Sequence, residues 1–180
     1  MAGPDDSLAR RVYERAHLVG AFRLRSGVLS DQYFDKYLFE SDPALLREIA
    51  TGLVDLLAPE TEAVAGLELG GVPLATMISQ LSGLPALFVR KAAKDYGTCR
   101  LAEGGEVAGR RIAVIEDVVT SGGQLVKSCQ DLREREATIV SVLCVIDRQA
   151  GGVEALAAAG LVLRSLFTMS SLEAADRVRT

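Results

Sequence analysis

The chain has 180 residues, of which 49% are hydrophobic and 24% charged, and this composition fits one globular domain with a sizeable core. Its net charge of −4 argues against a broad basic surface for nucleic acid. Cys99, Cys129 and Cys144 are odd in number and show no paired spacing, so they predict neither a disulfide framework nor a zinc site. A reducing cytoplasm fits this cysteine usage best.

The sequence also predicts no membrane partner. The N-terminus is polar and acidic, unlike the basic and then apolar start of a signal peptide. The uncharged run 69–89 is the one membrane candidate, but glycines and prolines interrupt it repeatedly. We therefore expect a soluble chain in which this run forms a loop, a helix, a turn and a strand.

The first part of the chain lacks a regular alternation of strand and helix. Apolar residues at helical spacing predict a first amphipathic helix. These residues are Leu8, Val12 and Leu18. Segments 22–27 and 30–39 then predict two short strands around a turn. We expect residues 1–40 to form a small N-terminal hood within a single domain of residues 1–180.

Beyond the hood, the pattern becomes regular. Asp42 and Pro43 predict a helix start with a capping residue and a proline at the first position. The strands expected after this helix are 63–66, 86–90, 112–115, 139–146 and 161–167. The helices expected between them are 74–81, 125–132 and 153–159. Near-continuous apolar strands separated by helices imply an α/β fold, with a mostly parallel sheet covered by helices on both faces.

The most informative segment is VIEDVVTSGG, residues 114–123, in which an apolar strand leads into two acids and then into hydroxyls and glycines. Glu116 and Asp117 are expected where α/β sheets bind ligands, and their carboxylates can accept hydrogen bonds from ribose hydroxyls. The residues that follow offer hydroxyls and backbone N–H groups to a phosphate at a helix N-terminus. They are Thr120, Ser121, Gly122 and Gly123. A plain turn can also carry such residues, but capping alone does not need two carboxylates.

A long polar segment, residues 91–109, interrupts the alternation of strands and helices. Arg90, Lys91 and Lys94 place three cations close together at its start, as a lid over a polyphosphate requires. The alternative is a solvated basic turn. We favour the lid because the segment belongs to the same predicted sheet as the sugar-phosphate motif.

Residues 114–123 closely resemble the phosphoribosyl diphosphate motif of type I phosphoribosyltransferases. RKAAKDYG, residues 90–97, resembles the flexible catalytic loop of the orotate phosphoribosyltransferases, and the resemblance covers almost the whole chain. It implies that family's fold and the transfer of a 5-phosphoribosyl group to orotate, giving orotidine 5'-monophosphate in pyrimidine biosynthesis. It also implies Mg²⁺ held mainly by substrate oxygens and water, and a homodimer in which each lid reaches the neighbouring subunit's site.

The resemblance implies roles for the residues of the lid and the acid pair. Lys94 is the main catalytic cation, and Arg90 and Lys91 assist it at the diphosphate. Asp117, with Glu116, holds the ribose as the sugar flattens. Tyr96 stands where the family loop commonly has histidine; tyrosine can donate a hydrogen bond but carries no positive charge at pH 7.

Further matches concern the base and the diphosphate. By resemblance to the hood segment, Arg25 contacts the substrate or the diphosphate, while Tyr33 and Phe34 face the base pocket. Arg148 holds orotate, since a planar guanidinium suits a planar acid. Taken alone, Arg148 is more often a surface arginine and the aromatic pair more often core. Segment 66–75, with Gly70 and Gly71, corresponds to a loop whose backbone binds diphosphate. Some family members carry lysine at the position of Gly70. Without that cation, either backbone amides and the lid lysines suffice to bind the diphosphate here, or the affinity for it is lower.

Two other functions compete with the orotate enzyme. A purine phosphoribosyltransferase would share residues 114–123 but need neither the lid sequence nor Arg148. A regulator of the same fold would bind nucleotide or RNA without turnover, but the retained Lys94 and the full acid pair favour catalysis. His17, the one histidine in the sequence, is expected to be structural.

Overall fold

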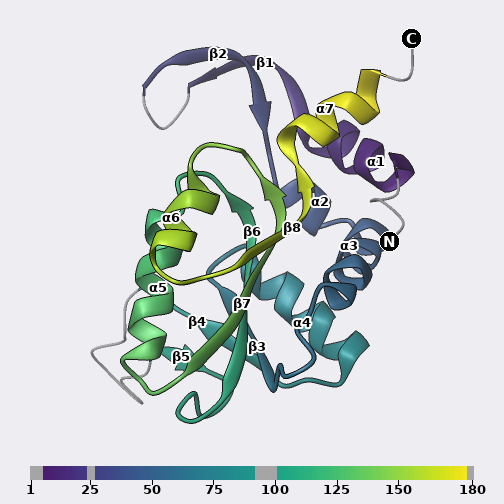
Figure 1. Ribbon diagram of the computed structural model, residues 1–180. Helices are drawn as coiled ribbons and strands as arrows, with labels where there is room; N and C mark the ends of the chain where they lie inside the picture. Colours follow the sequence, from purple (N-terminus) through teal and green to yellow (C-terminus); the bar gives the residue numbers. More distant parts are fainter. Residues whose placement is uncertain (1–5, 24–26, 92–100, 178–180) are drawn as a thin grey trace.

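The body of the molecule is a six-stranded sheet with helices on both faces (Figure 1). The computed structural model describes residues 6–23, 27–91 and 101–177. The strand order is β5-β4-β3-β6-β7-β8. The strands are β3 (Ala63–Leu67), β4 (Ala86–Val89), β5 (Ala102–Glu103), β6 (Arg111–Val119), β7 (Thr138–Asp147) and β8 (Leu163–Thr168). All neighbours pair in parallel except β4 and β5, which confirms the predicted mostly parallel α/β sheet.

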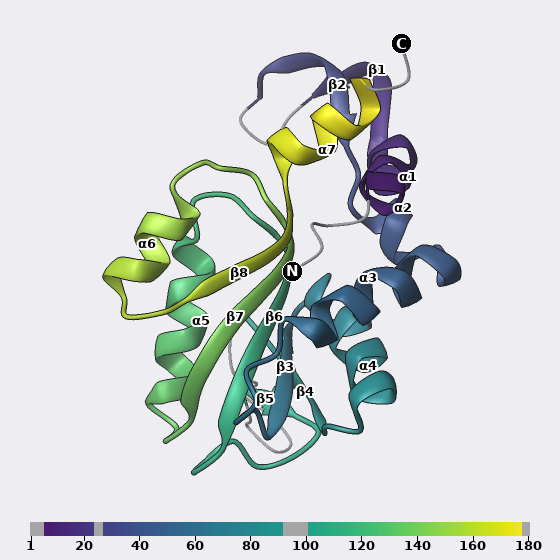
Figure 2. The same cartoon turned by 45° about the vertical axis from the view of Figure 1, so that its right-hand side comes forward.

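Two hydrophobic cores fill the space between this sheet and its helices. Alternate residues of β6 point to opposite faces, so Ala113 and Ile115 join one core and Ile112 and Val114 the other. The first core includes α3 (Pro43–Asp55) and α4 (Gly71–Ser82), and the second includes α5 (Gly123–Arg133) and α6 (Gly152–Ala158). Figure 2 shows these pairs of helices on either side of the sheet.

The start of α3 forms as the sequence predicts. Asp42 caps the helix, because its Oδ1 accepts hydrogen bonds from the N–H groups of Ala44 at 3.0 Å and Leu45 at 3.1 Å. Pro43 occupies the first helical position, where its missing N–H costs no hydrogen bond. Cys129 and Cys144 are buried in the second core as expected, and burial raises the pKa of both thiols. Cys99 lies outside the described residues.

The N-terminal part differs from the prediction in three places. The strand expected over 22–27 is instead β1 (His17–Arg23), which begins five residues earlier, at His17. α1 (Asp6–Ala16) ends before Leu18, because β1 begins there and pairs antiparallel with β2 (Leu29–Phe34) in a separate two-stranded sheet. The single strand expected over 30–39 is wrong, since α2 (Tyr37–Glu40) follows β2. The Asp35 side chain accepts a hydrogen bond from the Tyr37 N–H at 3.1 Å, which supports the turn into the helix.

The C-terminal helix α7 (Met169–Arg177) is absent from the sequence prediction. Thr168 and Ser171 exchange backbone-to-hydroxyl hydrogen bonds at 3.0 and 3.1 Å, a reciprocal arrangement typical of a helix start. Leu172 and Ala175 join the first core together with Val12 of α1. α7 therefore covers the N-terminal elements, as Figure 1 shows.

The run 69–89 divides into a turn, α4, a connection and β4, as predicted. Among the helices of the described ranges, none combines the length and the apolar character needed to cross a bilayer.

Candidate active site

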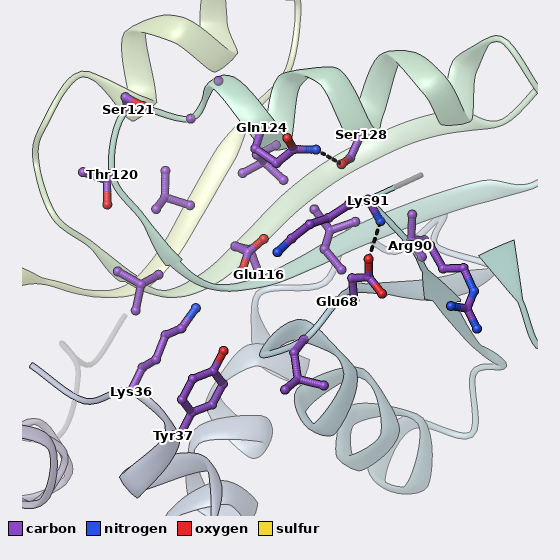
Figure 3. A pocket seen from close by; sticks show the side chains of 18 residues that line it. Lys36, Tyr37, Glu68, Arg90, Lys91, Glu116, Thr120, Ser121, Gln124 and Ser128 are labelled. Atoms are coloured by element: carbon purple, nitrogen blue, oxygen red, sulfur yellow. Dashed lines mark hydrogen bonds between the residues drawn. The ribbon is translucent and has the colours of Figure 1, made fainter. Parts of the chain in front are cut away.

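A cavity of about 380 Å³, the first cavity, opens at the carboxyl ends of β3, β4 and β6 (Figure 3). Its walls come from α2, the turn after β3, the end of β4, and the segment from β6 into α5. The polar and glycine residues that line it are Lys36, Tyr37, Glu68, Arg90, Lys91, Glu116, Thr120, Ser121, Gly122, Gly123, Gln124 and Ser128. This edge of a parallel sheet is where ligands of α/β proteins bind.

The loop between β6 and α5 forms one end of the first cavity. Gly122 has φ of 74°, a left-handed conformation that favours glycine, and α5 begins at Gly123. The first N–H groups of a helix have no carbonyl partners within it, so they can bind an anion. Thr120 and Ser121 are exposed and line the same end of the cavity. The strand, turn and helix predicted for this motif are confirmed, and the chain places its hydroxyls and glycines at the cavity.

The two adjacent acids lie within β6 rather than after it, because the pairing of β6 with β7 continues to Val119. Their carboxyl groups lie close enough to interact, but the two side chains differ in exposure. Glu116 lines the first cavity, whereas Asp117 is fully buried and does not line it. Burial, followed by the hydrogen bond and charge of Asp117, raises the pKa of Glu116 well above its usual value. Of the predicted pair, Glu116 is the acid directly available to a ligand.

Asp117 is enclosed by groups from three segments. Its Oδ1 accepts the Val118 N–H at 2.5 Å, and its Oδ2 lies 2.5 Å from Lys36 Nζ. A Cβ on Gly70 would lie 1.5 Å from the same Oδ2, so the carboxylate occupies the space of a side chain at that position. Burial lowers the pKa of Lys36, but the hydrogen bond and charge of Asp117 outweigh this and leave it raised.

A third carboxyl group approaches from α2. Glu40 is buried, and its Oε1 is 2.8 Å from the point that a Cβ on Gly70 would occupy. Burial, with a further contribution from the charge of Asp117, raises the pKa of Glu40 to about 8. Glu40 therefore keeps its proton to a higher pH than an ordinary glutamate, which lowers the negative charge that Lys36 has to compensate.

The two described cations at the start of the predicted lid, Arg90 and Lys91, point their side chains to different partners. Lys91 is exposed and extends across the first cavity toward Glu116, while its backbone N–H donates to Glu68 Oε1 at 2.7 Å (Figure 3). Arg90 lines the cavity too, but its Nε lies 3.7 Å from Glu103 Oε1. Lys94, Tyr96 and Arg25 lie outside the described residues, so their roles stay predictions.

A second cavity, of about 310 Å³, lies between the β1–β2 hairpin, α1 and α7. It brings together the three described residues assigned to the base by resemblance, Tyr33, Phe34 and Arg148. Its other lining residues are Tyr13, His17, Ser30, Gln32, Met169 and Glu173. A single residue, Asp35, separates Phe34 of this cavity from Lys36 of the first.

His17 begins β1 and lies in the wall of the second cavity. Its ring stacks on Tyr13 with centroids 4.7 Å apart, and its Nε2 lies 3.0 Å from Gln32 Oε1. Tyr13 also contacts Phe34, with ring centroids 6.3 Å apart. The contacts of His17 join α1 to β2, in keeping with the structural role expected for it.

Several residues of the first cavity are absent from the sequence prediction. Lys36 and Tyr37 reach it because α2 turns the chain after β2, which an extended segment would not do. Gln124 and Ser128 are one turn apart on α5, and their side chains lie 3.4 Å apart. That spacing directly after Gly123 is the one signal that could have revealed the α5 pair.

Comparisons with known proteins agree with this architecture. A model of the phosphoribosyl transferase domain matches residues 39–160. The chain is 51% identical to an orotate phosphoribosyltransferase of Nocardioides sp. over 95% of its own length and 96% of that protein. It is 40% identical to one of Halobacterium salinarum, covering 96% and 98%. The crystal structure of Mycobacterium tuberculosis orotate phosphoribosyltransferase in complex with 5-phospho-alpha-D-ribosyl 1-diphosphate superposes with a TM-score of 0.80 at 30% identity, over 93% of this chain and 98% of that one.

Proposed function

The chain belongs to the orotate phosphoribosyltransferase family, and from this membership we propose how its residues carry the reaction. The protein transfers the 5-phosphoribosyl group from phosphoribosyl diphosphate to orotate, giving orotidine 5'-monophosphate and diphosphate in pyrimidine biosynthesis. The observation that supports the residue roles best is the first cavity. It combines an acid, cations and a helix N-terminus at one sheet edge.

The sugar phosphate binds across the end of β6. Thr120, Ser121, Gly122 and Gly123 hold the 5'-phosphate with hydroxyls and backbone N–H groups. Glu116 accepts hydrogen bonds from ribose hydroxyls, since its carboxylate faces the first cavity. Asp117, which is buried and interacts with Glu116, supports this contact without lining the first cavity.

The diphosphate leaves toward the start of the lid. Breaking the bond at the anomeric carbon builds positive charge on the ribose and negative charge on the leaving group. Lys91 and Arg90 from the cavity wall, and Lys94 from the lid, stabilise that negative charge. Gly70 and Gly71 are buried and do not line the first cavity, so we propose that they shape the turn after β3, whose Glu68 and Leu69 do line it. Tyr96 of the lid serves as an added hydrogen-bond donor.

Mg²⁺ fits the same place as a companion of the substrate. Within the described ranges, no three His, Cys, Asp or Glu side chains gather closely enough to hold an ion by themselves. A magnesium ion that enters with the diphosphate needs few protein ligands, because phosphate oxygens and water complete its shell. When bound, it neutralises charge on the leaving group.

Orotate occupies the second cavity. Arg148 holds its carboxylate and carbonyl oxygens with a planar guanidinium, and Tyr33 and Phe34 flank the ring. Arg25, which precedes Tyr33 and Phe34 in the hood sequence, contacts the substrate or the diphosphate. The orotate nitrogen then attacks the anomeric carbon as diphosphate leaves.

Membership of this family also suggests a cellular location, an oligomeric state and a domain organisation. We propose a cytoplasmic homodimer whose lids are shared between subunits, without a nucleic-acid or membrane partner. Residues 1–180 act as one domain, and residues 1–40 serve as the hood over the base. This proposal is supported by the β1–β2 hairpin, which lines the second cavity, and by Tyr37 of α2, which lines the first.

The direct test mixes the purified protein with phosphoribosyl diphosphate, Mg²⁺ and orotate and follows the ultraviolet absorbance of orotate. We expect absorbance loss with the wild type and with Lys127→Ala, an exposed lysine that lines neither cavity, and almost none with Lys94→Ala. Turnover of adenine or guanine in place of orotate would move the chain to the purine enzymes. Binding without turnover of any base would make it a regulator.

A further inference from the structure

A lysine at the start of α2 connects the buried acid to the first cavity. Lys36 Nζ lies 2.5 Å from Asp117 Oδ2, and the Lys36 side chain is 33% exposed whereas that of Asp117 is 0% exposed. In Figure 3 the Lys36 side chain extends into the cavity toward Glu116. Lys36 therefore contacts the buried carboxylate while forming part of the cavity wall.

The carboxylate that Lys36 contacts is packed between the segments that build the first cavity. Its Oδ1 accepts the Val118 N–H at the end of β6. Its Oδ2 fills the place of a side chain on Gly70, in the turn after β3. The Asp117 side chain is therefore packed against the Gly70 turn, and a change in its position would disturb that packing.

The charge balance at this point depends on Lys36. A buried carboxylate is costly unless a cation or several donors compensate it. The titratable groups that interact electrostatically with Asp117, apart from Lys36, can carry only negative charge. They are Glu40 from α2, Glu116 on β6 and Cys144 on β7, and Asp35 in turn acts on Glu40. In the part of the chain that the structure describes, Lys36 is the cation paired with Asp117.

We propose that Lys36 is a positioning residue for the transfer reaction. By neutralising Asp117, it fixes this carboxylate between β6, α2 and the Gly70 turn, and so keeps Glu116 and the turn in the geometry that binds ribose and diphosphate. The proposal rests on the function assigned to the first cavity. It differs from a direct substrate contact, because Lys36 acts through Asp117.

The test is a double-mutant cycle of Lys36→Met, Asp117→Asn and the double variant, with Lys36→Arg as the conservative change. We expect Lys36→Met to raise the KM for phosphoribosyl diphosphate about tenfold to hundredfold, as for truncation of a buried charge pair. The KM for orotate should stay within about twofold, and Lys36→Arg should recover most of the loss. In the Asp117→Asn background, Lys36→Met should change the KM by less than about twofold, because the partner charge is already gone.

Lys127→Met, on the exposed side of α5, is the matched control and should behave as the wild type. If the fold-changes in KM caused by Lys36→Met and Asp117→Asn simply multiply in the double variant, the proposal is overturned, because Lys36 would then contact substrate directly. An equal rise in KM for Lys36→Met and Lys36→Arg would also overturn the proposal. If Asp117→Asn does not fold, this comparison of the two Lys36 variants is the deciding test. Calorimetric titration with phosphoribosyl diphosphate measures the same coupling without turnover, so a wild type inactive on orotate would refute the proposed function while the coupling is still measured.

Discussion

The two cavities are built in different ways. The first lies at the ends of buried strands, where Ile115 of β6 and Ala65 of β3 are 0% exposed. The second lies beside a two-stranded hairpin on which Val19 and Leu29 are 80% and 79% exposed. The comparison indicates that packing fixes the first cavity, the proposed phosphate side of the site, whereas a few surface elements form the second cavity, the proposed base side.

The largest expected effect comes from a methyl group in the buried region. A Cβ on Gly71 would lie 2.3 Å from the Ile115 carbonyl oxygen, and a backbone atom cannot easily move away. We expect Gly71→Ala to lower the free energy of unfolding by about 3 kcal/mol, measured by urea denaturation. Gly123→Ala is the control for stability, because nothing lies within 4 Å of its added Cβ. Equal midpoints for the two variants would contradict this account of the turn.

The same contrast explains what the sequence could predict. Apart from β5, which has two residues and is absent from the sequence prediction, the strands of the body are apolar runs, so their positions follow from composition and spacing. Asp42 with Pro43 identifies the start of α3. The hood contains short elements that depend on single hydrogen bonds, such as Asp35 to the Tyr37 N–H, and these do not stand out in a sequence. Thr168 and Ser171 do carry a recognisable helix-start spacing, which the prediction overlooked.

The different surroundings of the two acids could not be deduced from the motif alone. A strand that ends before Glu116 would leave both carboxylates in a loop, whereas β6 continues to Val119, so that Asp117 is fully buried while Glu116 lines the first cavity. The pairing of Asp117 with Lys36 joins residues 81 positions apart (117 minus 36), and only the tertiary fold brings them together. Contacts of this kind carry no local signal.

The second prediction concerns the base side. Arg148 is exposed in the wall of the second cavity. We expect Arg148→Met to raise the KM for orotate about tenfold to hundredfold, the size expected for a lost charge-assisted hydrogen bond. The free energy of unfolding should change by less than about 0.5 kcal/mol, as for other surface changes.

Steady-state kinetics with each substrate varied in turn would measure this effect. Arg135→Met, an exposed arginine that lines neither cavity, is the control. A rise in the KM for phosphoribosyl diphosphate without one for orotate would place Arg148 on the wrong side of the site.

The third prediction tests the place where hood and body meet. The pKa of Glu40 is about 8 in the folded protein, against 4.5 for the ordinary side chain. Between these values the folded state holds a proton that the unfolded state has released, so stability should fall as pH rises from about 4.5 to 8. Glu40→Gln cannot ionise and should flatten this slope. At pH 8 the variant should exceed the wild type by about 1–2 kcal/mol, measured by urea denaturation at several pH values.

Glu134→Gln, at an exposed position after α5, should leave the pH dependence unchanged. A wild type whose stability is flat over the same pH range would show that Glu40 stays ionised in the folded protein. Lys36 would then have two buried carboxylates to compensate, and the hood would be joined to the body more weakly than the structure indicates.

The smallest expected effect is Val19→Thr in the hairpin. Since the side chain is 80% exposed, the added hydroxyl meets water, and the free energy of unfolding should change by less than about 0.5 kcal/mol. The identical substitution at Val114, which is 0% exposed in β6, provides the reference, because there the hydroxyl would be buried among apolar side chains at a cost of about 1–3 kcal/mol. Urea denaturation measures the loss of stability in each variant. Because the substitution is the same, any difference between the two losses reflects the surroundings of the side chain. If Val19→Thr proved as destabilising as Val114→Thr, the hairpin would be packed against something that shields it, and the base side could no longer be regarded as the exposed half of the site.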